Sequence, residues 1–286
     1  MAIELTIGAD PEVFVVDTDQ NLVPAYGLIP GTKDAPEECP DGATQVDGLA
    51  LEFNITPARS EDEFVYKINS VFNTLKSKLP SGLSPLVLPY VSFPGAVYDK
   101  LPREATQLGC DPDYNVWDRP ELARALPDAI SESRGRGAAG HIHIGWTNGA
   151  DIYSESHWAE VTAMLRQVDI LWTYVYSPIE PASGRQNWYG QRGVFRPKHY
   201  GVEFRTPSNS WLSSEALTRL AYRIVNKAAT DLIEGHEYWV SPNENLRIGA
   251  ASEMGRKWID DLKVGRTGHN LATAMSDFGA RQKKAA

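Results

Sequence analysis

Short segments in which apolar and polar residues alternate recur along the chain, and they constrain its fold more than any other feature. A period of two is typical of β-strands that bury one face. Strands are predicted at residues 3–7, 13–16, 22–24, 48–55, 141–146 and 201–205. A turn at 17–21 separates the second strand from the third. In the strand at 48–55, apolar side chains share one face, and Glu52 and Asn54 share the other.

Three longer segments carry apolar residues at helical spacing. The first begins at a capping box of Ser60 and Glu63 and stops at Pro80. The others run from about 156 to just before Pro178, and from a cap between 209 and 214 to Gly235. Strands and helices do not alternate strictly, as they would around a parallel sheet. The pattern therefore predicts an α+β fold with a largely antiparallel sheet.

Length and charge exclude several classes of protein. The 286 residues allow one large domain or two small ones. Because 37 Asp and Glu outnumber 28 Lys and Arg, a protein that coats nucleic acid is not expected. The two cysteines lack zinc-finger spacing and are too few for a disulfide framework, which favours a reducing, cytoplasmic location. We expect neither a signal peptide nor a membrane span, since no long apolar run occurs.

Two long polar segments, at 30–48 and 103–136, interrupt the pattern of strands. Loops of this length inside a compact domain are usually functional or disordered, so we predict that they cover a site. Beyond about residue 250 the chain is only weakly amphipathic. There we expect a terminal helix near 253–262, followed by a mobile basic tail.

Carboxylates gather on the predicted strands. Asp10 and Glu12 would point to the same side of one strand, an arrangement that is costly without a cation. Asp47, Glu52 and Asn54 face one way from another strand whose opposite face is apolar. Alternatively, Asp10 and Glu12 are simply solvated. For Asp47, Glu52 and Asn54, the alternative is that they form the solvent face of an edge strand.

Two histidines, His141 and His143, project side by side from a strand that follows a glycine-rich segment. This spacing suits metal ligation, or one metal ligand beside a phosphate contact. The alternative interpretation is that His141 and His143 are structural residues.

Four arginines lie within 21 residues of this acidic chain, among glycines and aromatic residues. They are Arg185, Arg192, Arg196 and Arg205. Arginines in such a setting indicate bidentate capture of phosphate or carboxylate, although a solvated basic face is the alternative. Lys33, in the loop at 30–48, is a further candidate for binding the nucleotide, as are Arg185, Arg192 and Arg196.

Several common catalytic motifs are missing. Neither the segment at 31–34 nor the one at 109–113 matches a P-loop, and the chain contains no G-x-G-x-x-G or G-x-S-x-G. Cys110 fits a packed thiol better than a nucleophile. Oxygen ligands with one histidine suit Mg²⁺ or Mn²⁺ better than zinc, and arginines suit the phosphates that accompany those ions. These residues favour a two-metal nucleotide site acting in phosphoryl transfer.

The order of these motifs resembles a known family. The motifs are Gly8-Ala9-Asp10-Pro11-Glu12, Asp47-Gly48-Leu49-Ala50-Leu51-Glu52-Phe53-Asn54, Gly109-Cys110-Asp111-Pro112-Asp113, Gly140-His141-Ile142-His143-Ile144-Gly145 and Tyr200-Gly201-Val202-Glu203-Phe204-Arg205. They resemble the phage-encoded carboxylate-amine ligases, or amidoligases, of the glutamine synthetase and glutamate-cysteine ligase superfamily. The resemblance covers about residues 3–235.

The resemblance implies a fold and a set of site residues. The fold would be a curved, largely antiparallel sheet like the glutamine synthetase catalytic domain, with helices on its convex face and ions and ATP on its concave face. That ligase domain would span 1–250, and 251–286 would form a helical or mobile tail. The metal ligands implied by the motifs are Asp10, Glu12, Glu52, His141 and Glu203. His143 would lie near the transferred phosphate or substrate, Arg192 or Arg196 would hold phosphate, and Arg205 would hold phosphate or the substrate carboxylate.

The implied activity is ATP-dependent amide bond formation through an acyl phosphate, with two or more Mg²⁺ or Mn²⁺ ions. Asp47 is our candidate for deprotonating the incoming amine. The expected substrates are small-molecule or peptide carboxylates and amines, with nucleic acid involved only as a modified-base acceptor. We expect no membrane partner, assembly into a homo-oligomer, and a location in the host cytoplasm if the protein is phage-encoded. The alternatives are a metal-dependent hydrolase built on His141 and His143, and a binding protein that keeps the fold without turnover.

Overall fold

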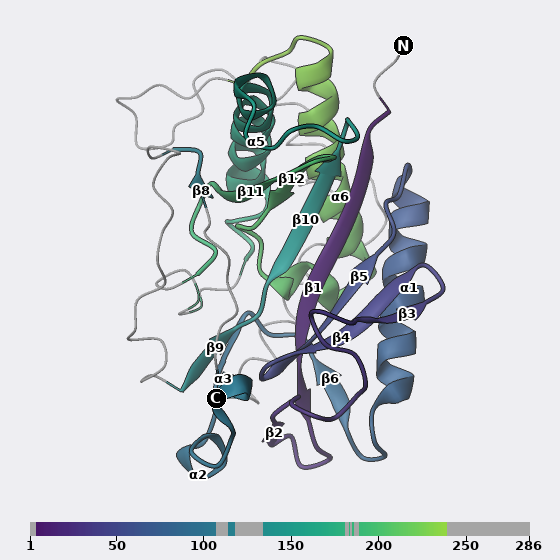
Figure 1. The fold of residues 1–286 in the computed structure, drawn as a ribbon, viewed down its shortest axis with the longest axis vertical. Coiled ribbons are helices and arrows are strands. Elements are labelled where there is room, and N and C mark those ends of the chain that lie inside the picture. The colour runs from purple at the N-terminus through teal and green to yellow at the C-terminus, as the bar shows by residue number, and fades with distance from the viewer. Residues whose placement is uncertain are drawn as a thin grey trace.

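The computed structural model describes residues 4–106, 114–117, 134–180, 183, 185 and 189–238 (Figure 1). Its strands are β1 Thr6–Val16, β2 Leu22–Val23, β3 Glu37–Cys39, β4 Gly42–Asp47, β5 Ala50–Ile55, β6 Ser84–Leu86, β7 Tyr90–Ser92, β8 Tyr114–Asn115, β9 Gly135–Gly137, β10 Gly140–Gly145, β11 Val194–Lys198 and β12 Gly201–Phe204. Its helices are α1 Glu61–Lys78, α2 Gly95–Tyr98, α3 Arg103–Thr106, α5 Glu155–Val175 and α6 Glu215–Ile233, with the 3₁₀ helix η2 at Asn209–Ser213. Among these helices, none has the length and apolar character needed to cross a membrane.

One large antiparallel sheet dominates the described structure. Its strands follow the order β3-β4-β5-β1-β10-β12-β11-β8, and β2 and β6 also pair with β1. The predicted α+β class with a largely antiparallel sheet is therefore confirmed. The long strand β1 lies in the middle, between β5 and β10, so its residues contact both halves of the sheet (Figure 1).

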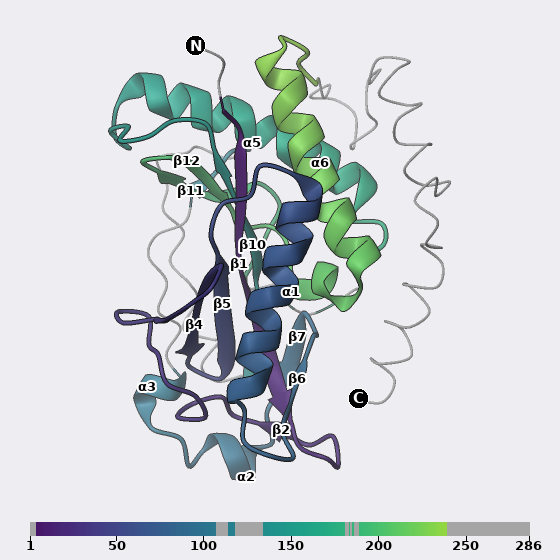
Figure 2. The same ribbon diagram turned by 90° about the vertical axis from the view of Figure 1, so that its right-hand side faces the viewer.

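The two faces of the sheet differ because its strands alternate. Ile7 on β1, Phe53 on β5 and Phe204 on β12 are buried in one apolar cluster with residues of the long helices. Figure 2 shows α1, α5 and α6 packed beside the sheet, and α1 contacts β5 while α5 contacts β12. The opposite face carries the polar residues of the same strands.

Helix α1 forms where the sequence predicted it. The Ser60 side chain accepts a hydrogen bond from Glu63 N at 3.2 Å, which satisfies a free donor of the first turn. Glu63 in turn accepts from Arg59 N at 2.8 Å. The other two long helices also begin at serine caps, Ser154 and Ser214.

Two sequence predictions are wrong. Residues 6–7 of the first predicted strand and the whole of the second, 13–16, belong to a single strand, because β1 continues through Pro11, which pairs with Gly140. The segment at 30–48 is not a long loop, since it contains β3 and β4, and Ala43 and Thr44 of β4 are buried. The predicted lid at 103–136 lies partly outside the described residues, as do Cys110, the 109–113 motif, the helix at 253–262 and the tail at 251–286.

Asp169 is a fully buried carboxylate on α5 that holds two neighbouring segments in place. It accepts hydrogen bonds from Trp117 Nε1 at 2.6 Å, Arg192 Nε at 2.8 Å and Gly193 N at 2.8 Å. Glu160, on the same helix, also accepts from an indole, Trp146 Nε1 at 3.0 Å, but it is exposed.

We expect Asp169→Ala to lower the free energy of unfolding by about 3 kcal/mol, because it leaves buried donors and a cation without an acceptor. The matched variant Glu160→Ala should cost less than about 1 kcal/mol, since water replaces the lost acceptor. Urea unfolding of both variants measures the difference. Equal losses would show that Asp169 does not hold these segments.

Candidate functional site

The polar face of the sheet brings together the five predicted metal ligands and the predicted base, Asp47, as two triads. Asp10, His141 and Glu203 form the first triad, from β1, β10 and β12. The second triad consists of Glu12, Asp47 and Glu52, from β1, β4 and β5. Within each triad the candidate ligand atoms all lie within 4.8 Å of one another. Strand β1 contributes one carboxylate to each triad, so the two triads are neighbours.

Strand register explains why these residues meet. Asp10 pairs with His141, and Glu12 pairs with Glu52. His143 pairs with Glu203, and because alternate residues of a strand share a face, the side chains of all six lie on one side of the sheet.

In the first triad, Asp10 lies between two imidazoles. Its Oδ1 is 3.4 Å from His141 Nδ1 and 3.1 Å from His143 Nε2. His141 Nδ1 is also 3.4 Å from Glu203 Oε1. His143 belongs to neither triad. Within the described residues, His141 and His143 therefore do not belong to the same candidate metal site.

A tyrosine hydroxyl contacts each histidine at the ring nitrogen that does not face Asp10. Tyr189 Oη lies 2.7 Å from His141 Nε2, and Tyr200 Oη contacts His143 Nδ1. Each ring therefore turns one nitrogen to a tyrosine and the other to Asp10. Hydrogen bonds of this kind fix the orientation and tautomer of a histidine that ligates a metal.

Glu203 is buried between two cations. It accepts from Arg205 Nη1, and Lys198 Nζ lies 2.8 Å from its other oxygen. Arg205 also lies over the ring of Tyr189, with its Cζ 5.3 Å from the centroid. Arg205 therefore contacts the first triad, and its expected role in holding phosphate or the substrate carboxylate stays a prediction.

Electrostatics keep the first triad in the form that binds a cation. Burial alone would raise the pKa of Asp10, but the charges of His143 and His141 hold it well below the usual range. Burial, with the charge of Arg205, lowers the pKa of His141 to about 4, so its imidazole is neutral at pH 7. An ionised carboxylate and a neutral imidazole are the states that ligate metals.

The second triad consists of three carboxylates, of which Arg136 pairs with Glu12 and Asp47. Burial raises the pKa of Glu52 well above its usual value, and the charges of Asp10, Glu12 and Asp47 raise it further. Burial also raises the pKa of Glu12 to about 7, although Arg136 opposes the shift. Carboxylates crowded in this way are stabilised by a cation.

The expected general base, Asp47, is weakly basic in this arrangement. Burial raises its pKa, but Arg136 and a hydrogen bond with Glu12 outweigh burial, so the net pKa is lowered. Arg136 Nη2 lies 2.5 Å from Asp47 Oδ2. A carboxylate held in an ion pair accepts a proton poorly at neutral pH, so this arrangement does not favour the expected role of Asp47 as a base, which stays a prediction.

The first triad passes a simple test of fit for a divalent ion. Asp10 Oδ1 is buried and, within the described part of the chain, accepts no well-oriented hydrogen bond, although two imidazole nitrogens are close. A buried carboxylate oxygen without such a bond is costly, and an ion would satisfy it. Carboxylates with one imidazole suit Mg²⁺ or Mn²⁺.

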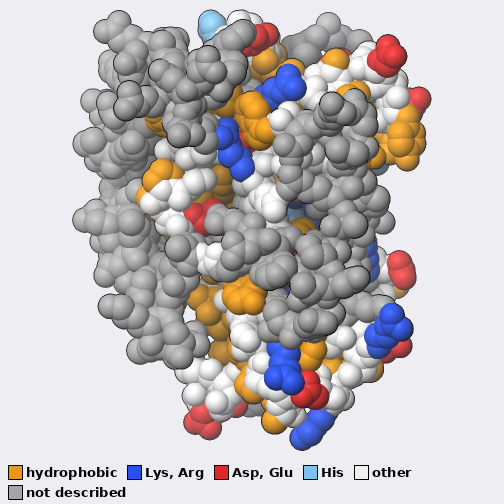
Figure 3. Space-filling model, turned by 90° about the vertical axis from the view of Figure 1, so that its left-hand side faces the viewer, with side chains coloured by type: hydrophobic (Ala, Val, Ile, Leu, Met, Phe, Trp, Pro, Cys, Tyr) orange, Lys and Arg blue, Asp and Glu red, His pale blue; other side chains and the backbone are white. Residues whose placement is uncertain are grey.

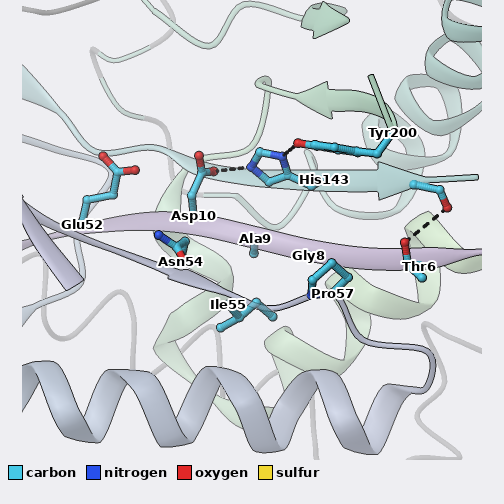
Figure 4. Close-up of a pocket in the computed structure, with 11 residues that line it drawn as sticks. Thr6, Gly8, Ala9, Asp10, Glu52, Asn54, Ile55, Pro57, His143 and Tyr200 are labelled. Atoms are coloured by element: carbon cyan, nitrogen blue, oxygen red, sulfur yellow. Dashed lines mark hydrogen bonds and ion pairs between the residues drawn. The ribbon is translucent and has the colours of Figure 1, made fainter. Parts of the chain in front are cut away.

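A cavity of about 420 Å³ opens beside the triads. It is lined by Thr6, Gly8, Ala9, Asp10, Glu52, Asn54, Ile55, Pro57, His143, Gly145 and Tyr200. Figure 4 shows Glu52, Asp10, His143 and Tyr200 in a row along β1, with Ile55 and Pro57 on the other side of that strand. The cavity thus joins acidic ligands at one end to an aromatic ring and glycine backbone at the other.

The predicted nucleotide-binding residues separate into two groups. Arg196 on β11 pairs with Glu203, beside the first triad, and Lys33 is exposed and close enough to Asp47 to lower its pKa. Arg185 is different: its buried guanidinium donates to Thr206 O at 2.9 Å and Pro207 O at 3.0 Å. Main-chain carbonyls therefore hold Arg185, and its assignment is corrected to a structural role.

Arg192 contacts a carboxylate outside the two triads. Its Nε lies 2.8 Å from Asp169 Oδ2, and its guanidinium lies over the ring of Trp117. The expected binding of phosphate by Arg192 stays a prediction. Figure 3 shows the face of the molecule that lies at the left of Figure 1. On that face, the basic and acidic side chains of the described residues are interspersed.

Four residues that contact the triads or His143 were given no role from the sequence. Arg136 was treated as part of a flexible lead, and Lys198, Tyr189 and Tyr200 were not assigned to the site. Two of them had a usable signal, since Tyr189 lies within the segment rich in glycine, arginine and aromatic residues and Tyr200 begins the motif that contains Glu203.

Comparison with known proteins supports one class. Residues 135–247, less than half of the chain, match the model of a family described as phage phiEco32-like COOH.NH2 ligase-type 2. The match confirms the resemblance to phage-type carboxylate-amine ligases over that segment, which contains His141, Glu203 and the arginines. No curated protein matches this chain in sequence.

Among solved structures, a bifunctional glutathione synthetase from Pasteurella multocida is similar at a TM-score of 0.38 and 11% identity. The similarity covers 99% of this chain and 46% of that protein, so the chain spans about half of its length. This similarity is too low to assign a fold or an activity.

Proposed function

We propose that this chain is an ATP-dependent carboxylate-amine ligase that forms an amide bond through an acyl phosphate, with two Mg²⁺ or Mn²⁺ ions. The observation that carries the proposal is the pair of triads on one face of the sheet, with one ligand of each on β1. The family match over residues 135–247 supports the reaction class. A carboxylate is a poor electrophile, and its phosphorylation by ATP makes amide formation feasible.

The residues around the triads support specific roles. Asp10, His141 and Glu203 would hold one ion, and Glu12, Asp47 and Glu52 the other. The ions would neutralise charge on the transferred phosphoryl group. Arg196 and Lys198 on β11, and Arg205 directly after β12, lie beside Glu203, where they are suited to bind phosphate oxygens.

The cavity supports a place for the nucleotide. Tyr200 offers a ring for stacking, and Gly8 and Gly145 let the backbone approach closely. We assign this cavity to adenosine, with its phosphates directed to Asp10 and His143. We further propose that residues 1–250 form a curved, glutamine synthetase-like domain. The proposed substrates are small molecules or peptides, and the proposed setting is a homo-oligomer in the cytoplasm of a phage-infected host.

Isothermal titration of a nonhydrolysable ATP analogue into the full chain, with and without Mg²⁺ or Mn²⁺, tests the function. We expect binding that requires the ion, followed by phosphate release from ATP when acid and amine mixtures are added. The variant Glu12→Gln with His141→Ala should lose the binding. Folded protein that binds ions but no nucleotide would favour a hydrolase, and protein that binds neither would favour a non-catalytic fold.

A further inference from the structure

We propose that Arg136 is a built-in counter-cation that competes with a divalent ion for the second triad. The inference rests on the proposed function, because it requires that Glu12, Asp47 and Glu52 bind such an ion. It assigns to this chain a residue that sets the affinity of one ion site.

Arg136 contacts two carboxylates of the triad directly. Its Nη2 lies 3.2 Å from Glu12 Oε1 and 2.5 Å from Asp47 Oδ2. Arg136 is 9% exposed and Glu12 is 6% exposed, so both charges are shielded from water. One guanidinium nitrogen therefore bridges two of the three carboxylates that would ligate the ion.

Both oxygens of Glu12 are already used in this arrangement. Oε1 accepts from Arg136, and Oε2 accepts from Ala139 N at 2.9 Å. An ion bound to Glu12 and Asp47 would stand next to the guanidinium, where two cations repel each other strongly in a buried setting. The ion and Arg136 therefore exclude each other from the same oxygens.

The backbone of Arg136 is fixed, so displacement involves only the side chain. Arg136 pairs with Val91 between β9 and β7. Gly135 packs so closely on Tyr90 that an added Cβ would lie 1.8 Å from its hydroxyl oxygen, and Ala138 N donates to Pro89 O. Competition with an ion would therefore be a matter of the Arg136 side chain and not of the strand that carries it.

The test is titration of Mn²⁺ into the full chain without nucleotide, followed by calorimetry or by the spin resonance of free Mn²⁺. We expect Arg136→Gln to tighten the ion site at least about tenfold, as removal of an adjacent like charge should. Arg136→Lys, a shorter cation that reaches fewer carboxylates, should lie between the wild type and Arg136→Gln. Arg134→Gln, which removes a surface partner of Asp99 near the same strand, should bind like the wild type.

Thermal unfolding provides a second readout. Without ions, Arg136→Gln should melt below the wild type, and saturating Mn²⁺ should raise its Tm more than that of the wild type, since the ion replaces the missing cation. If Arg136→Gln folds only when Mn²⁺ is present, the competition is supported as well. If Arg136→Gln does not fold in either condition, the Mn²⁺ affinity of Arg136→Lys tests the competition instead, and it should exceed that of the wild type.

Equal or weaker Mn²⁺ binding in the Arg136 variants than in the wild type would overturn the inference. If the wild type still binds Mn²⁺ and ATP analogue together, the proposed function stands and only the role of Arg136 fails. If neither wild type nor variants bind Mn²⁺, with or without the analogue, both proposals fail.

Discussion

Asp10→Asn is expected to reduce ion-dependent binding of an ATP analogue by roughly 100-fold or more, with a loss of turnover at least as large. Asp10 is the only carboxylate that touches both His141 and His143 among the described residues, and its buried Oδ1 is an acceptor without a well-oriented donor. An amide presents a neutral oxygen in its place, and its NH₂ group would face the imidazoles. The ion of the first triad therefore loses its central ligand.

Calorimetry with Mn²⁺ and the nonhydrolysable analogue measures the effect. The control is Asp19→Asn, an exposed carboxylate in the turn after β1, which should bind like the wild type. Urea unfolding without ions should show that Asp10→Asn is folded. Undiminished binding by a folded Asp10→Asn would remove the first triad from the site.

Glu52→Gln is expected to stabilise the ion-free protein while it weakens the stabilisation that Mn²⁺ confers through the second triad. Burial and the charges of Asp10 and Glu12 raise the pKa of Glu52, so its ionised form is unfavourable in the folded state. Removing that charge should add on the order of 1–3 kcal/mol to the free energy of unfolding at neutral pH. The same charge is needed for the ion, and the variant therefore separates stability from function.

The pH dependence gives the sign of this effect. Below the ordinary pKa of a glutamate, Glu52 is protonated in both the folded and the unfolded chain, so wild type and variant should be equally stable. As the pH rises above that value, the unfolded chain ionises first, and the advantage of Glu52→Gln should grow until the raised folded pKa is reached. Urea unfolding of wild type and Glu52→Gln at a series of pH values measures this difference in stability, and Glu38→Gln, which changes an exposed glutamate, is the control. A constant difference would contradict the raised pKa.

Much of the candidate site could be predicted because strand alternation is a local property. The spacing of Asp10 and Glu12 was enough to put both on one face, and the same holds for His141 and His143. Which residues face each other across strands is not local. Asp10 meets His141 through pairing between segments about 130 residues apart, and here the resemblance supplied what periodicity does not.

Other predictions were wrong because local chemistry concealed the tertiary partner. Acidic and glycine residues made 30–48 look like a loop, but pairing with β5 makes β4 a strand. Pro11 reads as a break because it cannot donate to a ladder, and yet β1 continues through it. Arg136 lies among glycines that suggested flexibility, and only the carboxylates of distant strands give it a role.

The position of the two triads on one strand has a geometric consequence. Asp10 and Glu12 are two residues apart on β1, so the extended backbone spaces their Cα atoms by roughly 6.6 Å. Side-chain rotamers and surrounding loops change that interval little. Substitutions that alter substrate choice in the loops would leave the separation of the two ions intact, whereas a single inserted or deleted residue between Asp10 and Glu12 would send one carboxylate to the apolar side of the sheet.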